Sequence, residues 1–251
     1  MTKTLHVVTY NIRKGFSRLG GGRVVVHELR NSLRAMDADV LFLQEVQGVH
    51  ESRATRFSNW PSKPQYEFLA DQIWPDFAYG RNSVYDGGHH GNAILSRYPI
   101  VRWDNQDVSA HRFENRGMLH CEMEIAGWSE PLHCVNVHLG LTGRGRDYQL
   151  VALRERIEVL VPPRAPLIIA GDFNDWRKQA NRVLCGRLNL TEAFEISRGR
   201  PARSFPCALP LFHLDRIYLR GFRVQHTEVH RGPAWAKMSD HAALCATVVK
   251  V

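Results

Sequence analysis

Two strand–helix–strand segments, each ending in a carboxylate, constrain the fold more than any other feature of this chain. In the first segment the two apolar strands end at Asn11 and Glu45, and in the second they end at His138 and Asp172. The stretch between each pair of strands has apolar residues at helical spacing. Such a unit sets two parallel strands side by side with the helix across one face. We therefore expect two similar halves whose strand ends meet at one cleft. Strand–helix–strand units are common in proteins, so a chance similarity between the two segments is the alternative explanation.

The rest of the chain consists of short strands, with no linker, low-complexity run or charge block that would divide it. Patterns typical of strands cover 77–80, 93–95, 118–125, 217–219, 222–229 and 242–249, and helix-like patterns cover 28–36, 148–161 and 176–184. The helix over 148–161 is expected to end at Pro162-Pro163. A chain of 251 residues can bury a large core, so we expect one domain over residues 1–251.

The net charge is strongly basic. The chain has 33 Lys and Arg against 25 Asp and Glu, a formal net charge of +8, and 27 of the basic residues are Arg. An arginine guanidinium binds phosphate oxygens in a bidentate manner, which favours a polyanionic partner. Codon usage in a GC-rich genome would give the same composition, so the charge alone leaves both explanations open.

The cysteines and the N-terminus bear on the cellular compartment. The 5 cysteines are scattered, without a CxxC pair or a Cys/His cluster at zinc spacing, so we expect free thiols in a reducing compartment. The start Met1-Thr2-Lys3 leads directly into alternating residues rather than into an apolar leader. No stretch approaches the roughly 18 apolar residues of a membrane span. We therefore expect a cytoplasmic monomer without a transmembrane segment.

Polar side chains able to bind a metal or a phosphate follow the apolar strands. These residues are Asn11, Glu45, His138, Asp172, Asn174, Asp215, Asp240 and His241. Their carboxylate and amide oxygens suit a hard cation, and the carboxylates and imidazoles suit acid–base work. Taken singly, each residue is more typical of a helix N-cap or a turn. The recurrence of such groups at strand after strand favours an active site.

Seven short motifs follow one another along the chain, namely Tyr10-Asn11, Leu43-Gln44-Glu45, Gly91-Asn92-Ala93-Ile94-Leu95-Ser96, Asn136-Val137-His138-Leu139, Gly171-Asp172-Phe173-Asn174, Leu214-Asp215-Arg216-Ile217 and Ser239-Asp240-His241. In these motifs and their order the chain resembles the endonuclease/exonuclease/phosphatase superfamily. That superfamily includes secreted deoxyribonucleases, abasic-site repair endonucleases, neutral sphingomyelinases and inositol polyphosphate 5-phosphatases. The sequence looks closest to a small, uncharacterised bacterial branch, some of whose genes sit beside cardiolipin synthase.

The resemblance implies a deoxyribonuclease I-like fold, a four-layer α/β/β/α sandwich of two packed mixed sheets flanked by helices. It also implies Mg²⁺, with Mn²⁺ as a second option, and water attack on a phosphodiester. By the same resemblance, the metal ligands would be Glu45 with Asn11 and Asp240. The catalytic residues would be Asp172, Asn174, His138, His241 and Asp215, and Asn11, Asn92 and Arg116 would bind the substrate.

The roles implied for the catalytic residues differ. Asp172 would deprotonate the attacking water and Asn174 would position it. His241 and His138 would donate hydrogen bonds to phosphate or leaving-group oxygens. Asp215 would orient an imidazole.

The sequence indicates the type of reaction more clearly than it indicates the substrate. Nucleic acid is the leading candidate, an anionic lipid head group is the alternative, and a catalytically silent binding module is the third. Basic residues that follow strand ends, among them Arg13, Lys14, Arg97 and Arg116, are expected near the cleft. The apolar run 207–212 could be a membrane-facing hairpin, but because it leads directly into Asp215 we expect it to be buried core.

Overall fold

The computed structural model describes residues 4–17 and 22–251. Residues 1–3, part of the start that we interpret as lacking a leader, lie outside the described residues. In the part of the chain that is described, no helix is both long and apolar enough to cross a membrane. All five cysteines are free thiols, as expected.

The first sheet has the strand order β11-β12-β1-β2-β4-β3. Its strands are β1 (Thr4–Asn11), β2 (Val40–His50), β3 (Asp76–Tyr85), β4 (Gly88–Ser96), β11 (Phe222–His230) and β12 (Ala243–Lys250). The helices α1 (Val26–Ala35), α3 (Gln65–Ala70) and α7 (Pro233–Met238) pack on its outer face. The short elements η1 (Arg13–Gly15) and α2 (Glu51–Arg56) follow β1 and β2.

The second sheet has the strand order β5-β6-β7-β8-β10-β9. Its strands are β5 (Ile100–Asp107), β6 (Gly117–Met123), β7 (Leu132–His138), β8 (Leu167–Asp172), β9 (Thr191–Glu192) and β10 (Asp215–Arg220). The helices α4 (Gly143–Leu160) and α5 (Gln179–Leu188) cover its outer face, and α6 (Ala193–Arg198) contacts β10 and β11 at one edge.

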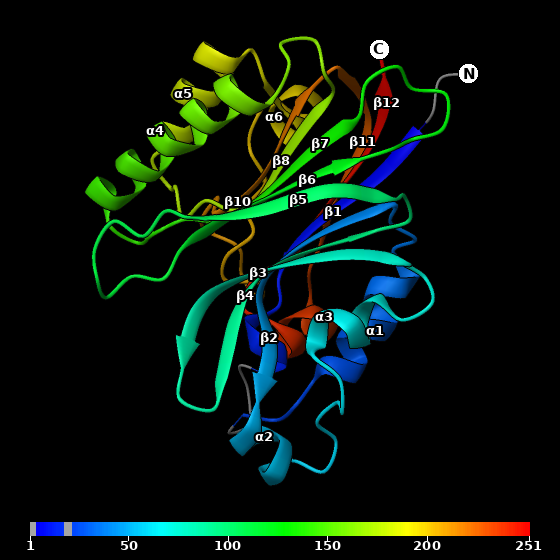
Figure 1. Ribbon diagram of the computed structural model, residues 1–251, viewed down its shortest axis with the longest axis vertical. Helices are drawn as coiled ribbons and strands as arrows, with labels where there is room; N and C mark the ends of the chain where they lie inside the picture. The colour runs from blue at the N-terminus through cyan, green and yellow to red at the C-terminus, as the bar shows by residue number, and fades with distance from the viewer. Residues whose placement is uncertain (1–3, 18–21) are drawn as a thin grey trace.

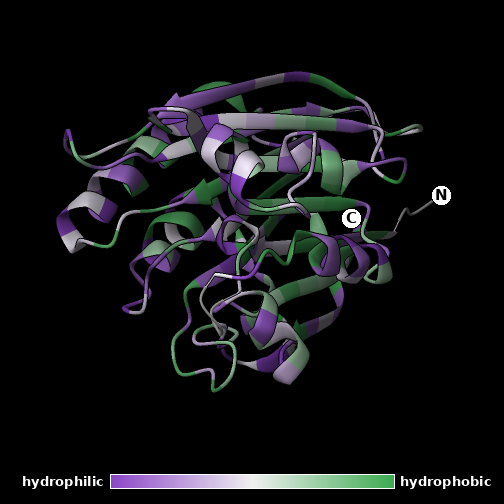
Figure 2. Ribbon diagram, turned by 90° about the horizontal axis from the view of Figure 1, so that it is seen from below, coloured by the Kyte–Doolittle hydropathy of each residue, from purple (hydrophilic) through white to green (hydrophobic). Residues whose placement is uncertain are grey.

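The two sheets face each other across a shared apolar layer, so the molecule has four layers. Val7, Phe42 and Ile94 of the first sheet meet Leu119 and Ile168 of the second in this layer. Figure 1 shows α4 and α5 outside one sheet, and α1 and α3 outside the other. In Figure 2 several strands in the middle of the view are largely hydrophobic, whereas the helices mix hydrophilic and hydrophobic residues. The expected α/β/β/α sandwich of two mixed sheets is confirmed.

The two strand–helix–strand segments form equivalent parts of the two sheets. β1 pairs with β2 in parallel, β7 pairs with β8 in parallel, and the remaining neighbours pair antiparallel. In both strand orders the parallel pair occupies the third and fourth positions. The similarity between the two halves is therefore structural, and the prediction from the sequence is confirmed.

Two of the predicted helices, α4 and α5, begin at other residues than the apolar pattern indicates, and each has a side-chain hydrogen bond to a backbone N–H of its first turn. Thr142 Oγ1 accepts a hydrogen bond from Gly145 N at 3.2 Å, so α4 begins at Gly143, five residues before the predicted start. The helix ends just before Pro162-Pro163, as expected. Asp175 Oδ2 accepts from Ala180 N at 2.8 Å in the first turn of α5, which starts three residues later than predicted.

Candidate active site

The ends of strands from both sheets meet at a cavity of about 440 Å³. Seven of its lining residues are polar, namely Asn11, Glu45, Arg116, His138, Asp172, Asn174 and His241. Asn11 ends β1, His138 ends β7 and Asp172 ends β8, so the parallel strands of each half deliver these side chains to the same place. The cleft predicted between the two halves is present.

Asp172 is the buried centre of this cavity. Its side chain is 2% exposed, and three nitrogen atoms approach its Oδ2, those of Asn11 Nδ2 at 3.2 Å, His138 Nε2 at 3.5 Å and His241 Nε2 at 3.7 Å. Its Oδ1 accepts a hydrogen bond from Asn174 N at 3.0 Å. Burial raises the pKa of Asp172 to about 6, although His241 opposes the shift. This carboxylate can therefore exchange a proton near neutral pH.

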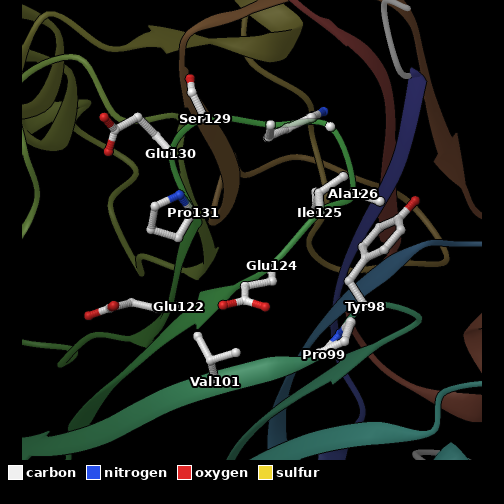
Figure 3. Close-up of a pocket in the computed structure, with 12 residues that line it drawn as sticks. Tyr98, Pro99, Val101, Glu122, Glu124, Ile125, Ala126, Ser129, Glu130 and Pro131 are labelled. Atoms are coloured by element: carbon white, nitrogen blue, oxygen red, sulfur yellow. The ribbon is translucent and has the colours of Figure 1, made fainter.

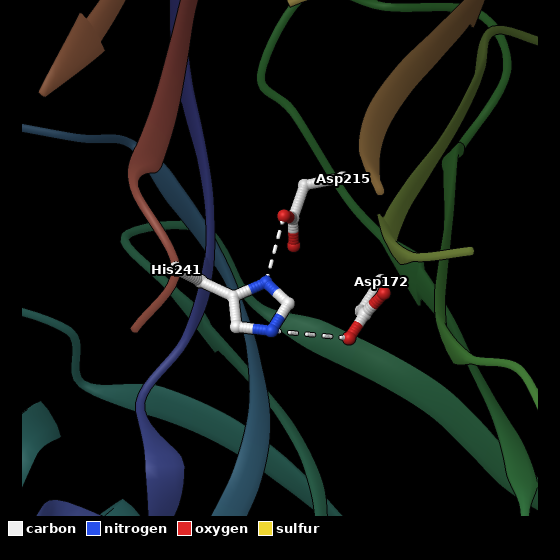
Figure 4. A group of neighbouring side chains, drawn as sticks. All are labelled: Asp172, Asp215 and His241. Atoms are coloured by element: carbon white, nitrogen blue, oxygen red, sulfur yellow. Dashed lines mark hydrogen bonds and ion pairs between the residues drawn. The ribbon is translucent and has the colours of Figure 1, made fainter. Parts of the chain in front are cut away.

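His241 lies between two carboxylates, as Figure 4 shows. Its Nδ1 is 2.9 Å from Asp215 Oδ2, and its Nε2 is 3.7 Å from Asp172 Oδ2. Burial alone would lower the pKa of His241, but Asp215 and Asp172 outweigh burial and raise this pKa to about 10. The imidazole is therefore protonated on both nitrogens at neutral pH, and its Nε2–H points into the cavity.

The group Asp172, Asp215 and His241 has the compactness of a metal site, because its ligand atoms lie within 4.8 Å of one another. In the metal-free protein the two carboxylates hold His241 as an imidazolium, which has no free nitrogen lone pair for a metal. We therefore interpret this group, in the metal-free state, as a charge-paired histidine.

Glu45 reaches the cavity because β2 is irregular at this point. The register between β2 and β4 shifts between Leu43 and Val46, and the φ of Glu45 is +54°. A β-bulge redirects the side chain of the bulged strand, and a left-handed φ is uncommon for glutamate. The half-buried carboxylate lies 3.5 Å from Asn11 Nδ2 and 3.8 Å from Lys14 Nζ. The site holds this residue in a backbone conformation that glutamate adopts rarely.

The oxygen donors of the cleft fit a hard cation. The Glu45 carboxylate and the Asn11 amide lie side by side, and Mg²⁺ takes only one or two carboxylates in such sites. Asp240 lines a neighbouring hollow together with Glu45, and its Oδ2 is 3.3 Å from Arg13 Nε. Divalent cations are used across the family that this chain resembles. The assignment of these three residues as ligands stays a prediction.

Two other predicted catalytic residues lie at the cavity wall. Asn174 has a left-handed φ of +49°, and its Nδ2 donates to Leu139 O at 2.9 Å. Burial lowers the pKa of His138 well below its usual value, and Arg116 lowers it further, so this imidazole is neutral. The structure thus pairs a neutral histidine with a charged one on either side of Asp172.

The predicted substrate-binding residues are placed differently from one another. Arg116 lines the cavity, whereas Asn92 is buried and does not line it, and its Nδ2 donates to Gly117 O of the other sheet at 3.0 Å. Arg97 pairs with Asp37 at the opposite end of β2, so its expected place near the cleft is wrong. The reason is that β4 runs antiparallel to β2 and therefore ends at the far edge of the sheet.

One wall of the cavity is apolar, and the sequence patterns did not reveal it. It is formed by Leu141, Trp176, Phe205, Phe212 and Leu214. The nearest sequence signal was the run 207–212, which we expected to be buried core. A substrate in this cavity would contact apolar side chains on one side and charged groups on the other.

The expectation for the run 207–212 is wrong for most of its apolar residues. Cys207 is buried, but Leu209 is 69% exposed, Leu211 is 53% exposed and Phe212 is 46% exposed. Phe205 O accepts hydrogen bonds from the backbone N–H groups of Leu211 and Phe212. The chain therefore folds back on itself as a short loop in which Phe212 lines the cavity, whereas Leu209 and Leu211 are exposed nearby in the sequence.

A pair of amide side chains, Gln44 and Asn136, links the two sheets beside the site. Gln44 Nε2 donates to Asn136 Oδ1 at 2.8 Å, and Asn136 Nδ2 donates to the carbonyl oxygens of Leu43 and Ala93. Gln44 and Asn136 each belong to a motif noted in the sequence, but their pairing depends on the packing of two sheets. No local pattern could have indicated it.

A second cavity of about 680 Å³ lies at the opposite end of the second sheet, around the turn between β6 and β7 (Figure 3). The carboxylates of Glu122, Glu124 and Glu130 surround it. Three acidic side chains would repel a phosphate, and no imidazole or arginine lines this cavity within residues 4–17 and 22–251. The cavity at Asp172 is therefore the better candidate.

The sequence matches the Endonuclease/Exonuclease/phosphatase family over residues 8–241. It is 46% identical over 242 residues to "Uncharacterized protein YbhP" of Escherichia coli strain K12, covering 96% of this chain and 95% of that protein. A solved endonuclease/exonuclease/phosphatase from Beutenbergia cavernae has a TM-score of 0.76 at 20% identity, covering 98% of this chain and 72% of that chain. The human Nocturnin catalytic domain with bound sulfate has a TM-score of 0.76 at 16% identity, covering 100% of this chain and 98% of that chain.

Proposed function

Because the chain belongs to the endonuclease/exonuclease/phosphatase family, a family of metal-dependent phosphoric ester hydrolases, we propose that it hydrolyses phosphodiesters with Mg²⁺ or Mn²⁺, acting on nucleic acid or a related phosphodiester. One observation carries the proposal. Three nitrogen donors converge on one oxygen of the buried Asp172, beside the Glu45 carboxylate. This arrangement suits a reaction in which a water loses a proton while a phosphate gains charge.

Asp172 is proposed as the general base. A base works best when its pKa lies near the working pH, and burial raises the pKa of Asp172 to about 6. Asn174 N holds Oδ1, so we expect Oδ2, the oxygen nearest Asn11 and the two imidazoles, to accept the proton of the attacking water. The new P–O bond forms from that water, and the bond to the leaving oxygen breaks on the opposite side of the phosphorus.

The two histidines are proposed as hydrogen-bond donors to the reacting phosphate. His241 is an imidazolium whose Nε2–H donates to a non-bridging oxygen, and Asp215 holds it by Nδ1. His138 is neutral and donates to a non-bridging or leaving oxygen. A divalent cation held by Glu45 and Asn11, with Asp240 as a further ligand, would supply additional charge neutralisation at the phosphate.

The test is a substrate panel with the purified protein and Mg²⁺ or Mn²⁺. The panel contains supercoiled plasmid, abasic-site duplex, single-stranded RNA, bis-p-nitrophenyl phosphate, and cardiolipin or sphingomyelin vesicles. We expect metal-dependent hydrolysis by the wild type and a loss of at least about 10²-fold in Asp172→Asn, because the base is removed while the shape of the side chain is retained.

Asp175→Asn is the matched control. Asp175 directly follows the motif that contains Asp172 and is buried, but its Oδ2 accepts a hydrogen bond from Ala180 N in the first turn of α5 and it does not line the cavity. The Asn amide oxygen can accept the same hydrogen bond, so this variant should keep wild-type activity. Equal turnover in wild type and Asp172→Asn would contradict the role of Asp172. Absence of turnover on every substrate would contradict the proposed activity.

A lipid head-group phosphodiester is the second candidate substrate, and the exposed apolar loop that contains Phe212 favours it. Leu209 and Leu211 are exposed in the same loop as Phe212, which itself lines the catalytic cavity. Such side chains can enter the interfacial region of a bilayer while the cavity receives the head group. Cleavage of the vesicles without cleavage of any nucleic acid would select this candidate over the first.

A further inference from the structure

Arg53 of α2 is fixed in place beside the catalytic cleft. Its guanidinium lies 4.5 Å from the centroid of the Phe16 ring and 5.8 Å from that of Trp60, and these two rings stack on each other at 5.6 Å. Its Nη1 donates to Gln47 Oε1 at 2.7 Å. A guanidinium held by rings and one hydrogen bond loses little further freedom when it binds a ligand.

Arg53 lines a hollow of about 320 Å³ that adjoins the catalytic cavity. Arg13 and Lys14 also line this hollow, while Glu45 and His241 line both spaces. A substrate whose phosphate is attacked at Asp172 would therefore extend past Glu45 into a space with three cationic side chains.

The cations of this hollow differ in their partners. Lys14 Nζ is 3.8 Å from Glu45 Oε2, and Arg13 Nε is 3.3 Å from Asp240 Oδ2. Arg53 has no carboxylate within ion-pair distance anywhere in residues 4–17 and 22–251. It is also half-buried, and burial lowers its pKa. A partly desolvated charge without a counter-ion is costly, and a bound anion would offset that cost.

The backbone that carries Arg13 and Lys14 is held in an uncommon conformation. Their φ angles are +49° and +58°, in the left-handed region. Arg13 N donates to Asn11 Oδ1 at 3.1 Å, and Gln65 Nε2 donates to Lys14 O at 2.9 Å. Such residues persist where the surroundings determine the conformation, typically at functional sites. Here the result is that both side chains are directed into the hollow.

We propose that Arg53, together with Lys14, forms a second anion subsite that binds a phosphate of the substrate other than the one that is hydrolysed. The inference rests on the proposed function and narrows its substrate class to phosphodiesters that carry a second phosphate close to the scissile one. The planar fork of Arg53 matches two phosphate oxygens, and Lys14 adds a point charge. A polynucleotide and a lipid with two phosphates share this chemistry.

The test compares substrates that differ by one phosphate. The nucleic-acid arm uses the thymidine dinucleotide with and without a terminal phosphate, at the 5′ or the 3′ end. The lipid arm uses vesicles of cardiolipin, with two phosphates per molecule, against vesicles of phosphatidylglycerol, with one. The readout is the ratio of kcat/KM between the doubly and singly phosphorylated substrate, in which any general loss of activity cancels.

We expect the wild type to prefer the doubly phosphorylated substrate by about tenfold or more in one arm, since each factor of ten corresponds to about 1.4 kcal/mol. Arg53→Gln should bring this ratio close to one, and Arg53→Lys should restore it in part. Arg56→Gln is the matched control, because Arg56 is on the same helix and stacks on Phe57 but does not line the hollow. It should keep the wild-type ratio. An unchanged ratio in Arg53→Gln would overturn the subsite.

A binding measurement separates this inference from the proposed activity. Inorganic pyrophosphate is titrated into the metal-free protein by calorimetry, and the Arg53→Gln variant should bind it about tenfold more weakly or worse. If no substrate is hydrolysed but this difference is found, the proposed function fails and the subsite stands. If the two proteins bind pyrophosphate equally, the subsite is wrong whatever the activity.

Discussion

The charge of His241 depends on two neighbouring carboxylates. Its side chain is 8% exposed, and without partners such burial would favour the neutral imidazole. The Asp215 carboxylate at Nδ1 and the Asp172 carboxylate near Nε2 reverse this preference and raise the pKa to about 10. The imidazolium therefore persists through neutral pH, where Asp172, with a pKa of about 6, is ionised. A base and a hydrogen-bond donor thus coexist in adjacent positions.

We expect the Asp215→Asn substitution to lower the pKa of His241 in the metal-free protein. Removing a negative charge 2.9 Å from Nδ1 removes the strongest influence that favours the protonated form, while burial continues to oppose it. The imidazole should then lose its proton at a lower pH than in the wild type. NMR titration of the His241 Cε1–Hε1 signal, with a chelator present, measures this shift.

The control for this titration is Asp240→Asn. Asp240 also raises the pKa of His241, but it ranks behind Asp215 and Asp172 among the causes. Its replacement should therefore lower the pKa by less than the replacement of Asp215. An equal shift in both variants, or no shift in Asp215→Asn, would show that the ion pair does not determine the charge of His241.

At the scale of elements, β2 carries the irregularity that builds the site. Its bulge turns Glu45 into the cleft and interrupts the ladder with β4 after Leu43. Asn136 of β7 provides a hydrogen-bond donor for carbonyl groups at this position, because its Nδ2 donates to Leu43 O at 2.9 Å and to Ala93 O at 2.8 Å. The second sheet therefore satisfies backbone groups of the first at the point where the first sheet is distorted.

Asn136→Leu should lower the free energy of unfolding by about 2–4 kcal/mol, because buried carbonyls and the Gln44 amide lose their partner. Asn105→Leu is the comparison. Asn105 lies in a half-buried position and donates to a single side chain, Asn82. It should lose less stability. Guanidinium unfolding followed by circular dichroism measures both, and similar losses would argue against a special role of the Asn136 bridge.

Elements that follow a regular apolar pattern could be predicted from the sequence. Residues whose positions depend on packing between distant parts of the chain could not. The strand ends at Asn11, Glu45, His138 and Asp172 could be placed together because parallel strands end at the same edge of a sheet. The short helix α2 has no apolar periodicity, and none of its residues is buried, so nothing in the sequence indicated Arg53. The run 207–212 is apolar yet exposed, since apolar composition alone does not distinguish core from rim.

At the scale of the whole molecule, the site joins the two halves of the fold. Glu45 comes from the first sheet, Asp172 and Asp215 come from the second, and His241 precedes β12 of the first but pairs with Asp215 of the second. A ligand bound in the cleft therefore contacts both sheets. One domain over residues 1–251 stays a prediction, and a single cooperative unfolding transition would support it.

Mg²⁺ should therefore stabilise the molecule as a whole, provided that Glu45 is present. A ligand at tenfold its dissociation constant stabilises the folded state by about 1.4 kcal/mol, which corresponds to a rise in Tm of roughly 3–6 °C for a chain of this size. We expect this rise in the wild type and its loss in Glu45→Gln, measured as the difference between Mg²⁺ and chelator. Glu51→Gln, which alters an exposed glutamate outside the cleft, should keep it. The difference between the two conditions removes any effect of the substitution on the metal-free protein, so an equal rise in Glu45→Gln would place the cation elsewhere.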